Sequence, residues 1–176
     1  MADKLKLTVN LAKSAVASPW ERKFLGYSLV GTEPRNYALR RPAINGWKRA
    51  CVKCSKVREG CSLSTFITRL NALLRGWMAY FRLSETEKAL EELDGWIRHK
   101  LRCILWRQWK RPYTHAMNLM QAGLKEEPAF RSAFNQRGPW WNSGASHMNQ
   151  SFPKSFFDRL GLVSILDTMR RIQSVQ

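Results

Sequence analysis

Long apolar runs, acidic residues and cysteines are all scarce in this sequence. No stretch of about 18 consecutive apolar residues occurs in the chain, which excludes the usual signature of a transmembrane helix. The first 20 residues alternate apolar and polar side chains and lack the continuous apolar segment of a signal peptide. We therefore expect no membrane partner and a cytoplasmic protein, or a nuclear or organellar one in a eukaryote.

The four cysteines are too few to indicate a disulfide scaffold, and in a reducing compartment they are expected to be free thiols. Cys51 and Cys54 form a Cys-x-x-Cys pair, followed by Cys61. A structural zinc site takes four ligands, and no second pair is present. His99 and Cys103 lie four residues apart and could complete a site. We expect no metal and no cofactor, with zinc kept as the alternative.

Signatures of catalysis are also missing. The chain contains no Gly-x-Ser-x-Gly elbow, no Walker loop and no His-Glu-x-x-His motif. Its few aspartates are scattered, whereas two-metal nucleotidyl transfer needs clustered carboxylates to hold the ions. The residues themselves thus predict no catalytic site.

Positive charge is abundant. Lys and Arg outnumber Asp and Glu by 30 to 13, for a formal net charge of +17. Such an excess repels itself in a folded monomer, and a phosphate backbone is the usual partner that neutralises it. Acidic proteins or membrane surfaces are the alternatives. Aromatic residues among the cations favour nucleic acid, because bases stack on aromatic rings.

Periodicity predicts a mainly α fold, a helical bundle with a small N-terminal pair of β-strands. Period-two alternation over 4–10 indicates a half-buried strand, the apolar run 24–30 a returning strand, and 36–39 a short third one. Helical spacing begins at 62, where Ser62 or Ser64 can cap, and again at Ser84, with Pro112 ending that second helix. Shorter helices are predicted at about 45–58, 114–122, 126–136, 155–160 and 164–172, and a loop at 138–153.

The segment 96–111 is the strongest physical signal, since it carries six cations and no acid. Arg98 and Arg102 are helical neighbours that repel each other unless phosphates lie along them. The tryptophans of the segment, Trp96, Trp106 and Trp109, can stack on unpaired bases or belong to the core. We favour the core for the tryptophans and binding for the cations.

A second signal lies in 70–82. Gly76 interrupts a strong helical pattern at a cost of about 1 kcal/mol relative to alanine. It can permit close approach of another helix or of a nucleic-acid backbone, and the sequence favours neither. Asn71 can bond a base edge or a neighbouring backbone group.

Together these segments resemble the group II intron reverse transcriptase/maturase family over nearly the whole chain. Residues 5–14 and 23–27 are similar to the strand pair that follows the Tyr-Ala-Asp-Asp box of the polymerase palm; the box itself is absent here. The run Leu70-Asn71…Arg75-Gly76-Trp77…Tyr80-Phe81, with the Arg/Trp helix after it, resembles the maturase-specific region, domain X. Residues 138–162 are similar to the segment downstream of domain X in bacterial members.

The resemblance implies three parts: a palm remnant at 1–42, a thumb-forming domain X at 43–112 and a C-terminal nucleic-acid-binding segment at 113–176. In the family, domain X binds intron RNA and stabilises its splicing-competent fold. It also contacts the template–primer duplex during reverse transcription. The resemblance implies RNA contacts at a set of basic residues: Lys48, Arg49, Lys53, Lys56, Arg75, Arg98, Lys100, Arg102, Arg107, Lys110 and Arg111.

The expected partner is therefore group II intron RNA, with a DNA target or a template–primer duplex as a further one. Because the catalytic box is absent, we expect no polymerase activity from this chain alone, and no DNA nicking because the family's endonuclease module is missing. Two alternatives stay open: the chain completes a split RNA-directed DNA polymerase with a separate fingers–palm polypeptide, or it is a non-functional truncated remnant.

Overall fold

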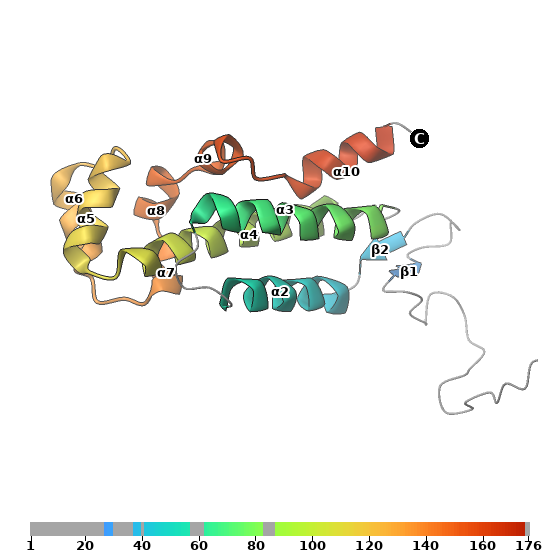
Figure 1. Ribbon diagram of the computed structural model, residues 1–176, viewed down its shortest axis with the longest axis horizontal. Coiled ribbons are helices and arrows are strands. Elements are labelled where there is room, and N and C mark those ends of the chain that lie inside the picture. Colours follow the sequence, from blue (N-terminus) through green and yellow to red (C-terminus); the bar gives the residue numbers. More distant parts are fainter. Residues whose placement is uncertain (1–26, 30–36, 40, 57–61, 83–86, 175–176) are drawn as a thin grey trace, which may run out of the picture.

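A computed structural model of the chain describes residues 27–29, 37–39, 41–56, 62–82 and 87–174 (Figure 1). It is mainly helical, as predicted. The strand predicted at 4–10 lies outside the described residues, so its pairing with 24–30 stays a prediction. The described strands are β1 (Tyr27–Leu29) and β2 (Tyr37–Leu39), which pair antiparallel with Ser28 opposite Ala38. Within the described part of the chain, no helix has the length and apolarity needed to cross a bilayer.

Three long helices form the body of the molecule: α2 (Arg41–Lys56), α3 (Leu63–Tyr80) and α4 (Glu87–Trp109) (Figure 1). The α3 helix begins at Ser62, whose hydroxyl accepts a hydrogen bond from the Thr65 N–H at 3.2 Å, as the sequence predicted. Ser84, the predicted cap of the next helix, lies outside the described residues. The apolar stripes of α3 and α4 are buried against each other and against Trp47 of α2.

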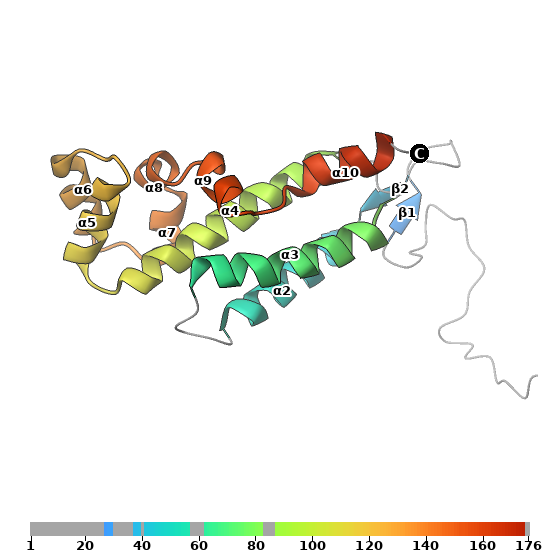
Figure 2. The ribbon, with the colours of Figure 1, turned by 45° about the horizontal axis from the view of Figure 1, so that its top comes forward.

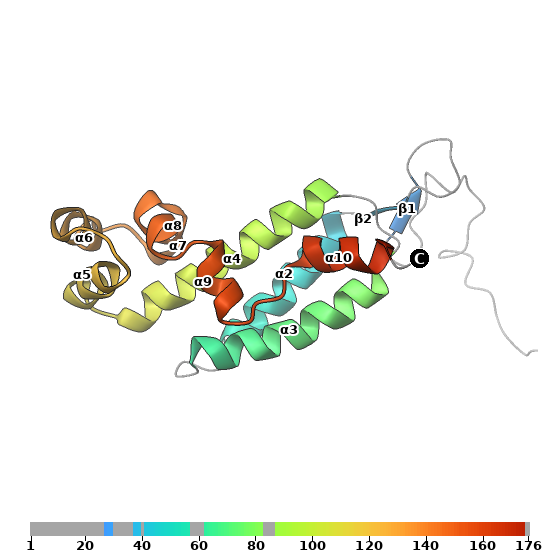
Figure 3. The same cartoon turned by 90° about the horizontal axis from the view of Figure 1, so that it is seen from above.

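The C-terminal helix α10 (Ile165–Ser174) lies between α3 and α4 on the side opposite α2 (Figures 1 and 3). Its apolar residues Ile165 and Met169 are fully buried in the same core. Residues far apart in sequence therefore close one hydrophobic centre, to which α2, α3, α4 and α10 all contribute.

The far end of α4 carries a group of short helices: α5 (Pro112–Gln121), α6 (Glu126–Ala133), α7 (Pro139–Gly144), α8 (Ser146–Ser151) and α9 (Lys154–Arg159) (Figure 2). The chain leaves α4 through Lys110, which has a left-handed φ of 57°. As predicted, α4 ends before Pro112. This proline is also the first residue of α5, where its missing N–H has no helical partner to lose. Gly123 and Gly161, with φ of 95° and 82°, follow α5 and α9 as predicted stops.

The loop predicted at 138–153 is wrong, because α7 and α8 occupy most of it. Its Gly, Pro, Ser and Asn residues are used as helix ends rather than as loop. Pro139 is the first residue of α7. Asn142 is fully buried, and its amide donates to the Arg137 carbonyl at 2.8 Å and to the Asn135 side chain at 3.4 Å. These bonds and the packing of α7 on α4 stabilise helices too short to show a periodic pattern.

Candidate nucleic-acid interface

Asn71 ties α3 to the linker between α9 and α10. Its side-chain amide donates to the Gly161 carbonyl at 2.7 Å, and its oxygen accepts from the Val163 N–H at 3.0 Å. Asn71 is buried, so both ends of the amide are used inside the protein. Of the two partners that the sequence left open for Asn71, a base edge or a backbone group, the structure shows the backbone.

Asp94 of α4 caps α10. Its buried carboxylate accepts hydrogen bonds from the Ser164 hydroxyl at 2.9 Å and from the N–H groups of Ile165 at 3.0 Å and Leu166 at 3.3 Å. A carboxylate at a helix N-terminus satisfies N–H groups that have no helical partner and is favoured by the helix dipole. Asp94 thus fixes where α10 starts on α4.

Arg102 is the third side chain, after Asn71 and Asp94, that connects a long helix to the C-terminal part of the chain by a hydrogen bond. Although it was predicted to contact RNA, it is buried, and its Nε donates to the Phe152 carbonyl at 3.0 Å. Its guanidinium lies 5.9 Å from the centre of the Phe157 ring. Burial, and then the nearby charge of Arg98, lower the Arg102 pKa. Arg102 therefore fastens α4 to the end of α8, and any RNA contact that it makes is additional to this internal bond.

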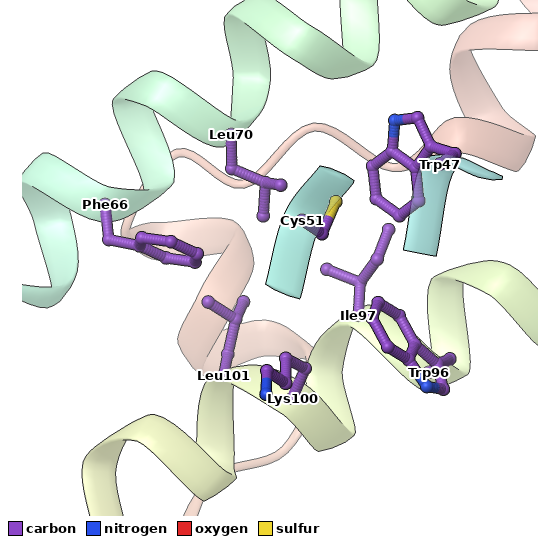
Figure 4. A pocket seen from close by; sticks show the side chains of 8 residues that line it. All are labelled: Trp47, Cys51, Phe66, Leu70, Trp96, Ile97, Lys100 and Leu101. Carbon is purple, nitrogen blue, oxygen red and sulfur yellow. The ribbon is translucent and has the colours of Figure 1, made fainter. Parts of the chain in front are cut away.

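Cations also line one face of the bundle, which we call the α2–α4 face and define by Lys48, Lys100 and Arg107. The Lys48 ammonium lies 5.5 Å from the centre of the Trp96 ring, which meets the Trp47 ring edge-on at 6.3 Å. Lys100 lines the same small pocket as these two tryptophans (Figure 4). The exposed Arg107 follows Lys100 by seven residues, two helical turns on the same side of α4.

A small hollow lies beneath this face, between Trp47, Cys51, Phe66 and Leu101 (Figure 4). Its volume is about 10 Å³, which is room for a single water at most. The lining side chains are almost entirely apolar. The hollow is a packing gap where three helices meet and is far too small for a substrate.

The other predicted cations that the structure describes are not part of this definition. Arg98 precedes Lys100 by two residues, so the two side chains leave α4 in different directions. Arg75 is exposed on the outer side of α3, and Arg49 is exposed on α2. Lys110 and Arg111 are exposed at the turn between α4 and α5. The side chains of Lys53 and Lys56 lie outside what the structure describes.

Few of these cations meet an acid. Among the described residues, the two ion pairs join Lys154 to Asp167 at 3.2 Å and Arg170 to Glu87 at 3.0 Å, both exposed. Within that same part of the chain, none of the predicted RNA-contact residues forms an ion pair. Their charges are therefore not neutralised by any acidic group of the described residues.

The tryptophans of α4 belong to the core, as favoured from the sequence. Trp106 is 4% exposed and stacks on His115 at 4.0 Å, while Trp96 and Trp109 are half-buried against the core. Among the described tryptophans, the exposed ones are instead Trp140 and Trp141 of α7, which the sequence did not single out as contacts because it predicted a loop there.

The cysteines that the structure describes, Cys51 and Cys103, are buried free thiols. His99, the other candidate zinc ligand, has its Nε2 hydrogen-bonded to the Trp140 carbonyl at 2.9 Å. In the described ranges no three His, Cys, Asp or Glu residues gather as a metal site would require. The structure does not describe the side chain of Cys54, and Cys61 lies outside those ranges.

The described residues form a helical bundle whose predicted RNA-contact cations make no ion pair within that part of the chain. A comparison with protein families places residues 44–123, from α2 to the end of α5, in the family described as group II intron, maturase-specific domain. This match supports the resemblance of that part of the chain to the C-terminal, maturase-specific region of group II intron maturases. No curated protein matched the chain.

Proposed function

We propose that this chain binds group II intron RNA and helps it to reach and keep its splicing-competent fold, and that its helices form the thumb of a reverse transcriptase. The observation that carries the proposal is the α2–α4 face, whose cations have no acidic partner in the described chain. The match to the maturase-specific domain supports RNA as the partner.

The physical reason is electrostatic. A cation that meets a phosphate releases counterions from the RNA, which favours binding at low salt and weakens it as salt rises. Lys48 is held beside Trp96, and Lys100 lies against the packed junction of α2 and α4, so both charges sit on a fixed scaffold. Fixed charges lose less conformational entropy on binding than mobile ones.

The three-part division of the chain into 1–42, 43–112 and 113–176 belongs to the same proposal. Asn71, Asp94 and Arg102 each bond residues of the last part. These anchors support a role in which the C-terminal segment and the thumb helices present their surfaces to nucleic acid as one unit. A DNA target or a template–primer duplex can be held by the same charges.

The test is the salt dependence of RNA affinity. Replacing Lys48, Lys100 and Arg107 together by alanine should reduce the slope of log affinity against log salt by about 2–3, if each residue meets a phosphate. The matched control removes three exposed cations elsewhere, Lys88, Lys125 and Arg159. Equal slopes for wild type and the first variant, or equal losses in both variants, would remove the α2–α4 face from the proposal.

A further inference from the structure

Two adjacent tryptophans of α7 are left half in solvent. Trp140 is 47% exposed and Trp141 is 48% exposed, although α7 packs closely on α4. Two adjacent exposed rings form a contiguous apolar surface, and such surfaces often mark an interaction site. Both rings, moreover, already have a specific group of this chain against them.

Trp140 is supported by His99 of α4. The imidazole stacks on the indole at 3.9 Å with an angle of 15° between the planes. The His99 Nε2 is bonded to the Trp140 backbone carbonyl at 2.9 Å, so it carries the proton and donates it, which fixes the imidazole. Gly144 leaves the room for this arrangement, because a Cβ there would lie 3.1 Å from His99 Cε1.

Trp141 is supported by a cation. The Arg137 guanidinium carbon lies 4.2 Å from the centre of the Trp141 ring, within the range of a cation–π contact. Arg137 is exposed and forms no ion pair with the described residues. An aromatic ring with a free guanidinium beside it offers both a surface for a base and a charge for its phosphate.

We propose that Trp140 and Trp141, held by His99 and Arg137, are a stacking platform for unpaired bases of a bound RNA strand. The proposal rests on the proposed function for its partner, and adds a second mode of contact to it. The α2–α4 face meets phosphates, whereas this platform meets bases. The net charge of +17 favours a polyanionic strand over a protein as the occupant.

The platform contributes affinity without sequence readout, because every base has an aromatic face that can stack. A ring that is already held in place also loses little freedom when a base arrives. The platform therefore favours single-stranded loops and ends of an RNA over its paired stems, whose bases are stacked on one another.

The experiment uses the full chain and a ten-nucleotide single-stranded RNA with 2-aminopurine at its centre. Wild type should quench the 2-aminopurine fluorescence on binding. Changing both tryptophans to leucine should weaken binding by about tenfold and abolish the quenching. Changing both to phenylalanine keeps aromatic rings of similar position and should retain most of both signals.

A second probe needs no variant. An oligonucleotide with abasic sites in place of the central bases keeps the phosphates, so wild type should bind it about tenfold more weakly than the intact strand. Equal affinity for the two strands, or unquenched 2-aminopurine with wild type, would overturn the platform, and a protein-docking role for the tryptophans would give that result.

Failure of the platform is distinguishable from failure of the proposed function. If the platform alone is wrong, structured RNA still binds with a salt slope that depends on the α2–α4 face. If the proposed function is wrong, the chain retains neither structured nor single-stranded RNA. The stacking proposal is then rejected as well.

Discussion

At the scale of single residues, the hydrogen bonds of the Asp94 carboxylate predict how much its removal lowers the free energy of unfolding. Replacing Asp94 by alanine leaves the Ile165 N–H buried without its acceptor and removes the cap of α10. The free energy of unfolding should fall by about 2 kcal/mol, as measured by urea denaturation. The neighbouring Glu92 is exposed, so its replacement by alanine should change stability by less than about 0.5 kcal/mol. Similar values for the two variants would contradict the capping role.

For Gly76 we predict a substitution that raises the free energy of unfolding. A Cβ added there would meet nothing of the described chain within 4 Å, so no helix that the structure describes explains the glycine. Replacing Gly76 by alanine should therefore stabilise the fold by about 1 kcal/mol, which a thermal or urea transition measures. If an RNA backbone approaches α3 at this point, the same variant should bind structured RNA more weakly. A destabilised variant would show that the glycine serves the fold itself.

Some residue-scale features could be read from the sequence and others could not. That Arg98 and Lys100 point in different directions follows from helical spacing alone. The burial of Arg102 could not be foreseen, because its bond goes to the Phe152 carbonyl, 50 residues further along the chain. Asn71 is a similar case, since Gly161 lies 90 residues beyond it.

At the scale of elements, length separates what periodicity can predict from what it cannot. The 18 residues of α3 and the 23 of α4 repeat their apolar spacing over several turns, so both were predicted close to their observed bounds. The six-residue helices α7 and α8 complete fewer than two turns each. Their composition is typical of loops, and their stability comes from packing on α4 and α5. The platform tryptophans were overlooked for this reason.

The short helices α5 and α8 each place a buried histidine against the Trp106 ring of α4. His115 stacks on that ring at 4.0 Å, and His147 lies 5.7 Å from it. Burial lowers the pKa of both histidines below the usual 6.5, and for His115 a hydrogen bond with the Trp106 carbonyl works in the opposite direction. Among the described residues, His115 Nδ1 and His147 Nε2 have no hydrogen-bond partner.

The sign of the resulting pH dependence follows from these pKa values. Below about pH 6.5 the unfolded chain binds protons that the folded chain excludes, so stability is full above that pH and falls as the pH drops. The free energy of unfolding should be lower at pH 5.5 than at pH 7.5. The lowered carboxylate pKa values of Glu87 and Asp167, from normal values of 4.5 and 3.8, act only at more acidic pH.

A variant with glutamine at both positions, His115→Gln and His147→Gln, should lose most of this pH dependence. Urea denaturation of the variant and of wild type at the two pH values provides the comparison. A wild-type stability that is equal at pH 5.5 and 7.5 would contradict the account of these histidines.

At the scale of the whole molecule, charge is segregated along α4. Its first two turns carry Glu87, Glu91 and Glu92, and the α10 residue Arg170 pairs with Glu87 there. The cations of the α2–α4 face and of the α4–α5 turn lie further along. The excess charge could be predicted from composition, but its placement depends on which side of α4 is covered by α2, α7 and α10.

The central claim, that this charge is matched to intron RNA, is tested most directly by measuring the affinity of the full chain for a structured group II intron RNA across a salt series. We expect the chain to retain the RNA in dilute buffer, with a slope of log affinity against log salt of about −4 or steeper, as several phosphate contacts require. No retention of the RNA even at about 10 mM salt, or an affinity that does not change with salt, would contradict it.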